Sequence, residues 1–309
     1  MGWGGSTQEA QAKAWTEPFS QQTGVPVQML NSVDYGQFRE MVERQDVLWD
    51  VVVVEADFAL SAGREGLLEP LDLKVVAQRD IDPRFITIYA VGAYYISFVL
   101  AYNLDEVAPA PSGWSAMFDL QRYPGKRALY KPARPGLIEM TLLADGVAVE
   151  DLYPLDLDRA FRKLDSIREH ILWWSDGEES KAHLSSGEAV MGMLWNGRVF
   201  ALQQSGARVA VNWQQNLVSG DFLVIPRGAR NKALAQQFLG FTSTAQRQAV
   251  HADLTGYGPV NINSSALLDA HALRNMPTSY RDEQINLDFK YWSKHGEEIS
   301  ARWNRWLSQ

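Results

Sequence analysis

The chain has 309 residues, of which 46% are hydrophobic and 21% are charged, and its formal net charge is -8 at pH 7. This composition is typical of a soluble globular protein and excludes a disordered chain, and the excess of negative charge argues against a nucleic-acid-binding surface. No apolar run is long enough to span a membrane, and the absence of cysteine excludes thiol catalysis, disulfides and cysteine metal sites. A chain of this length exceeds the usual size of one hydrophobic core, which predicts two lobes.

The amino-terminal part of the sequence predicts helices and strands in alternation. Residues 7–23 have the pattern of a helix, with Ser6 as the expected N-cap, Glu9 at the capping-box position and Gly24 as the end. The next expected elements are a strand that begins over residues 26–30, a helix over 35–44 and a buried strand over 49–54, where the sequence reads WDVVVV.

The middle and carboxyl-terminal parts continue this alternation. Residues 90–102 are rich in small, aromatic and β-branched side chains and predict an extended segment that leaves the first lobe. Further predicted elements are a strand over 126–130, helices over 137–144, 157–170, 231–243 and 245–254, and polar helices within 266–309. The sequence contains neither an internal repeat nor a low-complexity tract.

The most informative segment begins with the apolar run AVMGMLW, residues 189–195, which predicts a short buried strand. Asn196 is the expected N-cap of a helix over 198–205, which Gly206 ends. The chain then returns in GDFLVIP, a second buried strand. This order places Arg198 in the first turn of a helix at the carboxyl end of a strand, the edge at which open α/β sheets bind ligands.

Trp195, Arg198 and Asp221 are therefore expected to converge on a pocket for a small charged molecule. Arg198 has two interpretations. The positive end of the helix macrodipole disfavours a cation in the first turn, so a guanidinium there adds to the exposed amides in attracting a carboxylate or phosphate. Alternatively, Arg198 is a solvated surface side chain or a structural ion-pair partner of Asp221.

Several segments together are similar to one protein family. They are WDVVVVEADF with GREGLLEPLD, AYN at the expected exit from the first lobe, GEAVMGMLWNGRVFALQQSG, GDFLVIPRGARNKALAQQFLGF and TGYGPVN, and they occur in the family's order. The chain resembles the extracellular solute-binding proteins of ABC transporters, and in particular their spermidine/putrescine-binding branch. The resemblance implies an α/β, two-lobed, periplasmic-binding-protein-like fold of type II, in which each lobe is a mixed sheet flanked by helices and a hinge lies between the lobes.

The same resemblance implies how the chain is shared between the lobes. The first lobe is expected to contain residues 1–100 and 221–264, and the second residues 101–220 and 265–309. The family closes its lobes on a ligand and delivers the ligand to a membrane permease.

Three positions match ligand contacts of the polyamine-binding branch. Trp195, in the WNG motif, matches a tryptophan that packs against the aliphatic chain of the ligand. Asp221 matches an aspartate that binds an ammonium group, and Tyr257 in TGYGPVN matches a tyrosine that lines the pocket.

Other positions depart from that branch and change the expected ligand. Arg198 follows WNG, where the branch often has a small residue, and Lys131 and Arg134 stand where polyamine binders place acidic residues. A diamine would meet an uncompensated positive group, at a cost of several kcal/mol in a desolvated cleft. The ligand that satisfies both ends is a small zwitterion such as γ-aminobutyrate, with its ammonium facing Asp221 and its carboxylate held by Arg198.

Further candidate positions have two interpretations each. Asp57 follows the WDVVVV strand and either assists Asp221 with the ammonium or, like Glu55, caps the following helix. Ser6 either donates a hydrogen bond to the ligand or belongs to an ordinary glycine-containing turn. Tyr94 and Tyr95 are expected to place one ring in the cleft and the other in the core. Trp173 and Trp174 are expected to be packing residues.

The sequence contains no catalytic motif, because its five histidines lack metal-ligand spacing and no nucleophile elbow, P-loop or dinucleotide fingerprint is present. The predicted protein is therefore a non-enzymatic receptor with no cofactor, no metal and no nucleic-acid partner. We expect a monomer that captures a γ-aminobutyrate-like amino acid by lobe closure and delivers it to an ABC permease of the inner membrane.

Alternative functions remain open at this point. The ligand alternatives are a small organic anion such as a dicarboxylate, bound by Arg198 with Arg134, and a polyamine. A different class of function is a periplasmic ligand-sensing module for a signalling partner. The chain starts with Met1 and Gly2 directly before Trp3, which fits either a cytoplasmic protein or a periplasmic one whose leader has been removed. The resemblance favours the periplasm.

Overall fold

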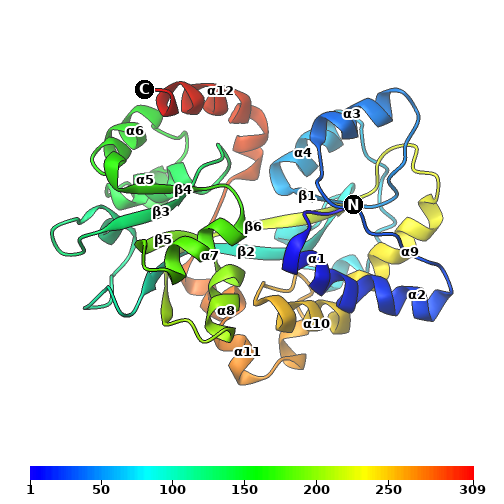
Figure 1. The fold of residues 1–309 in the computed structure, drawn as a ribbon. Helices are drawn as coiled ribbons and strands as arrows, with labels where there is room; N and C mark the ends of the chain where they lie inside the picture. Colours follow the sequence, from blue (N-terminus) through cyan, green and yellow to red (C-terminus); the bar gives the residue numbers. More distant parts are fainter. The chain divides into compact units, whose positions relative to one another are not determined.

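The structure is a computed structural model that describes residues 1–309. The chain divides into two compact units, each built from segments that are distant in the sequence: the first unit is Met1–Tyr95 with Gly220–Ser279, and the second is Ile96–Ser219 with Tyr280–Gln309. Each unit combines strands and helices (Figure 1), and the predicted mixed α/β class is confirmed. No helix combines the length and the apolar character that crossing a bilayer requires.

Two long strands carry the chain from one unit to the other. β2 (Ala90–Asn103) leaves the first unit and β6 (Val209–Val224) returns to it. The predicted lobes change after residues 100, 220 and 264, whereas the compact units change after residues 95, 219 and 279. The largest difference concerns the segment around α11 (Ala270–Arg274). Ala272 and Met276 are buried against Ala252 of the first unit, and this contact holds the segment there.

The first unit joins a short antiparallel ladder to a layer of helices. β1 (Val52–Glu55) runs antiparallel to the end of β6, with Glu55 opposite Asp221. Phe19 and Phe238 bring the helices α2 and α9 side by side (Figure 1), with their ring centroids 5.2 Å apart. The helices of this unit are α1 (Gly5–Gln11), α2 (Glu17–Thr23), α3 (Tyr35–Glu43), α4 (Ala56–Arg64), α9 (Lys232–Thr242), α10 (Ala245–Thr255) and α11.

The first helical run begins earlier than predicted and has a different cap. It starts at Gly5, and the π-helical segment Ala12–Thr16 joins α1 to α2. The N-cap is Gly4, whose amide donates to Oε1 of Gln8 at 2.8 Å. Ser6 lies inside the first turn, so the prediction of a Ser6 capping box is wrong. Glycine is favoured at the N-cap here because the position has a φ of 81°, which a side chain rarely adopts.

Two predicted strands differ from the structure. Residues 26–30 have no regular secondary structure, and β1 begins at Val52 although the WDVVVV pattern predicts a start at 49. A strand requires a neighbouring backbone to complete its ladder. Within the first unit, residues 26–29 form no backbone–backbone hydrogen bond, so their strand-like sequence lacks the partner that would order it.

The second unit contains three parallel strands. β3 (Lys126–Tyr130) lies between β4 (Ile171–Trp174) and β5 (Ala189–Trp195) and is parallel to both, while β5 is antiparallel to β2. The short β7 (Gln284–Asn286) is parallel to β6. The helices are α5 (Leu137–Ala144), α6 (Leu157–Asp165), α7 (Gly177–Ser185), α8 (Asn196–Gln204) and α12 (Phe289–Leu307).

Short 3₁₀ segments connect several of these elements. The predicted helix over 157–170 ends at Asp165, and a separate 3₁₀ turn covers Arg168–His170. The remaining 3₁₀ segments are Gln78–Asp80, Pro83–Phe85, Trp114–Phe118, Val149–Asp151, Ser264–Leu267 and Pro277–Glu283.

A buried carboxyl group ties the carboxyl-terminal helix to the second unit. Glu139 of α5 accepts hydrogen bonds from Nε1 of Trp292 at 2.6 Å and from the hydroxyl of Tyr153 at 2.7 Å. Burial raises the pKa of Glu139 above its usual value. The sequence predicts the helices on either side of this contact, but no local pattern indicates that they meet through a carboxyl group.

The strand and helix predicted around residues 189–205 are present as β5 and α8. Asn196, however, is the first residue of α8 and makes no capping bond, since the N-cap position is Trp195. Its side-chain Oδ1 instead accepts a hydrogen bond from the backbone amide of Ser97 at 3.0 Å. The predicted capping role of Asn196 is therefore wrong, and the residue fixes the start of α8 against β2.

Candidate ligand-binding residues

Three aromatic side chains gather at the carboxyl ends of the parallel strands in the second unit. Tyr130, Trp174 and Trp195 are the last residues of β3, β4 and β5. The ring centroid of Trp174 lies 4.6 Å from that of Tyr130 and 5.0 Å from that of Trp195. Because the carboxyl ends of parallel strands meet at one edge, this cluster occupies the position at which α/β sheets bind ligands.

The two neighbouring tryptophans of β4 serve packing, as predicted. Trp174 is fully buried, and its Nε1 donates to the carbonyl oxygen of Met193 at 3.1 Å. Trp173 contacts Trp303 edge to face, with the ring centroids 5.6 Å apart. Trp195 differs from Trp174 because it is only partly buried, which leaves part of its aromatic surface available at the strand edge.

Arg198 lies in the first turn of α8, as predicted, and packs against the amino-terminal end of α7. Its side chain is 13% exposed, so the interpretation as a solvated surface residue is wrong. A Cβ added to Gly177 would lie 2.1 Å from Nε of Arg198, which shows how closely the guanidinium approaches the α7 backbone. The carboxylate of Glu178 is 3.7 Å from Nη1 of Arg198. This geometry holds the guanidinium beside a helix amino terminus, where both groups favour an anion.

The loop between β3 and α5 carries the second candidate cation. Arg134 is half-buried, whereas Lys131 is exposed. The backbone amide of Lys131 donates to the carbonyl oxygen of Trp174 at 2.9 Å, which fixes the start of this loop beside β4.

The candidates of the first unit surround one carboxyl group. The hydroxyl of Tyr94 donates to Oδ2 of Asp221 at 2.6 Å, and the indole of Trp3 also donates to Asp221. The rings of Tyr94 and Tyr257 are stacked, with centroids 5.0 Å apart and planes at 11°. We refer to Trp3, Asp57, Tyr94, Asp221 and Tyr257 as the Asp221 group.

The surroundings of Asp221 disfavour the ionised form of its carboxyl group. Burial, and to a smaller extent the negative charge of Asp57, raises the pKa of its carboxyl group to about 6, although the hydrogen bonds from Tyr94 and Trp3 act in the opposite direction. Because the charged form of this carboxyl group is disfavoured, a cation that binds next to it stabilises that form. The Asp221 group is therefore suited to binding an ammonium group.

Neighbouring candidates of the first unit have distinct environments. Asp57 lies in the first turn of α4, and Glu55 occupies its N-cap position without making a side-chain capping bond. Oε2 of Glu55 instead accepts from the hydroxyl of Tyr35 at 3.2 Å, so its predicted capping role is wrong. Ser6 is exposed in the first turn of α1. Tyr95 is fully buried and stacks on Phe85, which places its ring in the core.

Tyr94 and Tyr257 of the Asp221 group belong to a column of four stacked rings. The centroids of Trp15 and His251 are 4.6 Å apart, those of His251 and Tyr94 are 4.9 Å apart, and Tyr257 follows on the other side of Tyr94. Burial lowers the pKa of His251 to about 3, so its imidazole is neutral at physiological pH. The column fixes the ring whose hydroxyl bonds to Asp221.

Sequence analysis does not identify Trp3, Gly177 or His251 as parts of these groups. Trp3 precedes a Gly-Gly pair and carries no ligand pattern of its own. Gly177 is the first residue of α7. The N-cap of this helix is Asp176, whose side chain accepts hydrogen bonds from the amides of Glu178 and Glu179, and no pattern singles out Gly177 itself. Of these three residues, only His251 has a signal in the sequence, because it lies three and four positions from Gln248 and Thr255 on the buried face of α10.

Comparison with known proteins identifies the family. The family model for bacterial extracellular solute-binding proteins matches residues 14–278. The chain belongs to this family of solute-binding proteins. The resemblance predicted from the WDVVVV, WNG and GDFLVIP segments is thereby confirmed.

Relatives of this solute-binding protein include receptors for two kinds of amine-bearing ligand. It is 35% identical to the gamma-aminobutyric acid-binding protein of Pseudomonas aeruginosa strain PAO1, over 100% of this chain and 90% of the relative. It is 22% identical to the spermidine/putrescine-binding periplasmic protein of Escherichia coli K12, over 87% of this chain and 79% of that protein. Among solved structures, the Atu4243 GABA receptor is 48% identical, with a TM-score of 0.95 and coverage of 99% of this chain and 95% of that one.

Proposed function

We propose that this protein is the solute-binding component of an ABC importer and that its ligand is γ-aminobutyrate or a similar linear amino acid. The proposal rests on one observation above all. One compact unit presents a carboxylate group that favours a cation, and the other presents guanidinium groups that favour an anion. A small molecule with one ammonium and one carboxylate has a favourable partner for each end.

The aromatic side chains support an unbranched ligand. Tyr257, stacked on Tyr94, and the partly buried ring of Trp195 offer apolar faces to methylene groups. An aromatic face within about 6 Å also attracts an ammonium group. The similarity to proteins named for binding γ-aminobutyrate agrees with this choice.

The alternative ligands fit the charges less well. A dicarboxylate would bring a second negative charge to Asp221, whose pKa is already raised by burial and by Asp57. A diamine would bring a positive charge to Arg198, which is 13% exposed and closely packed on α7. Each mismatch places like charges together in a partly desolvated site.

The transport role involves both units and a membrane partner. We propose that the two compact units act as lobes that close on the ligand, that the protein works as a monomer in the periplasm, and that the closed form docks on an ABC permease. Binding requires no chemical step. A role as a sensing module would use the same ligand groups, and pull-down with permease or signalling proteins separates the two roles.

A ligand screen tests the proposed chemistry directly. We expect γ-aminobutyrate to raise the melting temperature and to bind in calorimetry, whereas putrescine and succinate at the same concentration do neither. Butyrate and butylamine, each of which lacks one charged end, serve as matched controls and should bind much more weakly. Preferential binding of putrescine or succinate would contradict the zwitterion assignment.

The raised pKa of Asp221 predicts how affinity depends on pH. The ammonium group requires the ionised carboxylate, and the pKa of Asp221 is about 6 without ligand. Below pH 6 the ionised fraction falls, and we expect the dissociation constant to rise by up to about tenfold per pH unit. Calorimetry between pH 5 and pH 8 measures this slope. An affinity that stays constant down to pH 5 would show that Asp221 does not bind the ammonium.

A further inference from the structure

The loop of residues 131–136 follows β3 at the edge of the sheet that carries Trp195. Tyr130, the last residue of β3, has its ring centroid 5.5 Å from that of Trp195. The loop contains Arg134, which is half-buried. Loops at the carboxyl ends of parallel strands are where α/β sheets bind ligands. The way in which this loop is held therefore decides where the guanidinium of Arg134 is available.

The sequence of the loop restricts its backbone. Pro132 and Pro135 each fix φ, and they stand on either side of Arg134 in the sequence. The amide of Arg134 donates to the carbonyl oxygen of Pro132 at 2.9 Å, which closes a tight turn. Gly136 ends the loop with a φ of 129°, and an added Cβ would lie 2.9 Å from Cε of Met193. Few conformations are open to such a loop, and the contacts at its two ends select among them.

Helix α12 holds the first end of the loop. Nε1 of Trp303 donates to the carbonyl oxygen of Lys131 at 2.8 Å, and the amide of Lys131 donates to the carbonyl oxygen of Trp174 at 2.9 Å. One turn earlier in α12, Oγ of Ser300 is 3.5 Å from the carbonyl oxygen of Ala133. Trp303 is 2% exposed, so little water competes for its bond to the loop.

The same helix holds the second end of the loop through Glu139. The amide of Gly136 donates to Oε2 of Glu139 at 2.9 Å. The other oxygen of this carboxyl group, Oε1, accepts from Nε1 of Trp292 in α12 at 2.6 Å. Glu139 is fully buried, and a buried polar group whose oxygens are both bonded has little freedom to move. One helix thus fixes the loop on both sides of Arg134.

We propose that α12 sets the position of Arg134 for the carboxylate of the ligand, and that Trp303 and Glu139 are the positioning residues. Both act through the backbone of the 131–136 loop. A guanidinium on a fixed backbone loses less conformational entropy on pairing with a carboxylate than one on a mobile loop does. The inference deepens the proposed function and rests on it, because it requires an anionic group on the ligand.

A double-mutant cycle tests the effect on binding. Trp303→Phe keeps an aromatic ring against Trp173 but has no donor for Lys131. We expect it to weaken γ-aminobutyrate binding about three- to tenfold in calorimetry. In the Arg134→Ala background the same change should cost less than about twofold, because the guanidinium that it positions is already absent. Equal losses in the two backgrounds would overturn the proposal.

Trp306→Phe is the matched control on the same helix. Trp306 is 5% exposed and stacks on Trp303, with the ring centroids 5.0 Å apart. Its Nε1 donates to Oδ1 of Asp165 instead of to the loop. We expect this variant to change the affinity less than about twofold. A loss as large as that of Trp303→Phe would assign the effect to the aromatic cluster as a whole and would contradict the proposal.

Glu139→Gln tests the second end of the loop and does not depend on the folding of Trp303→Phe. The glutamine oxygen can still accept from Trp292, but the glutamine amide group cannot accept from the amide of Gly136. We expect about the same loss of affinity as for Trp303→Phe, and again little loss in the Arg134→Ala background. A variant that binds γ-aminobutyrate as tightly as the unmodified protein does would exclude Glu139 as a positioning residue.

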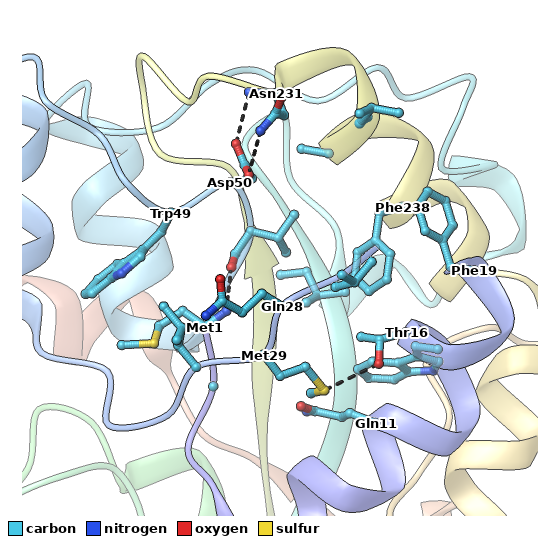
Figure 2. A pocket seen from close by; sticks show the side chains of 18 of the residues that line it. Met1, Gln11, Thr16, Phe19, Gln28, Met29, Trp49, Asp50, Asn231 and Phe238 are labelled. Carbon is cyan, nitrogen blue, oxygen red and sulfur yellow. Dashed lines mark hydrogen bonds between the residues drawn. The ribbon is translucent and has the colours of Figure 1, made fainter. Parts of the chain in front are cut away.

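Hydrogen exchange in the unliganded protein separates this inference from the proposed function. Trp303→Phe and Glu139→Gln should each speed exchange of the Arg134 amide by at least about fivefold, whereas Trp306→Phe should not. The internal control is the amide of Asn231 at the N-cap of α9 in the first unit, which donates to Oδ1 of Asp50 at 2.9 Å (Figure 2).

The two measurements have distinct outcomes. Unchanged exchange of the Arg134 amide would overturn the proposal even if γ-aminobutyrate binds. Faster exchange in a protein that does not bind γ-aminobutyrate would uphold the control of the loop by α12 and would contradict the proposed function alone.

Discussion

Replacing Arg198 by alanine is expected to weaken γ-aminobutyrate binding by about 30-fold to a few thousand-fold, which corresponds to about 2–5 kcal/mol. The physical reason is that the ligand carboxylate would enter a partly desolvated site without its cation. Arg198→Lys keeps the charge but loses the planar pair of donors, so it should recover only part of the affinity. Isothermal titration calorimetry measures both variants against the unmodified protein. If Arg198→Ala bound γ-aminobutyrate as tightly as the unmodified protein does, the assignment of Arg198 to the carboxylate would be wrong.

A second substitution moves the guanidinium of Arg198 without removing its charge. Gly177→Ala would place a Cβ 2.1 Å from Nε of Arg198, and the guanidinium at the end of a flexible side chain must move to make room. We expect this variant to lose affinity while its unliganded melting temperature stays nearly unchanged. The matched glycine control is Gly296→Ala in α12, where an added Cβ would lie 3.9 Å from the nearest atom. Gly206→Ala is unsuitable because Gly206 has a φ of 84°, which an alanine rarely adopts.

Asp221→Asn is expected to remove most of the affinity for γ-aminobutyrate and to leave the weak binding of butyrate unchanged. The asparagine side chain keeps an acceptor for Tyr94 but carries no charge to balance the ammonium. Calorimetry with the two ligands provides the comparison. An equal loss for both ligands would indicate a general disturbance of the site rather than loss of an ammonium partner.

The same variant also tests the folded-state pKa of Asp221. Because the pKa is raised from 3.8 to about 6, the folded protein holds a proton that the unfolded chain releases between these values. The associated stabilisation is fully present below about pH 3.8 and is lost as the pH rises through 6. The unliganded melting temperature should therefore fall more steeply over this range in the unmodified protein than in Asp221→Asn. Identical pH profiles would place the carboxyl pKa near its ordinary value.

The parts of the fold that sequence predicts well are those whose partners are close in the sequence. The apolar run of β5, followed by α8, has its own boundary signals and appears where expected. The sequence-based start of β1 fails because residues 49 and 50 belong to a strand-like pattern but form no backbone–backbone hydrogen bond within the first unit. Strand formation depends on a second backbone, and no local pattern records whether that backbone is present.

The candidate site shows the same division between local and distant information. The first-turn position of Arg198 follows from the strand–helix junction and is correct. Its close approach to Gly177 joins two helices that β5 separates in the sequence, so no spacing rule reveals it. The motif identifies Asp221. Its pKa is raised by burial and by the charge of Asp57, and the hydrogen bonds from Tyr94 and Trp3 oppose this rise, and all of these arise only after folding.

The column formed by Trp15, His251, Tyr94 and Tyr257 has a consequence for the protein's response to acid. His251 takes up a proton only near pH 3, so acidification to pH 5 leaves all four rings uncharged and their stacking intact. The neutral imidazole of His251 therefore keeps the Tyr94 ring in the same position at both pH values. The hydroxyl of Tyr94 stays directed at Asp221 while the carboxyl group of Asp221 gains or loses a proton.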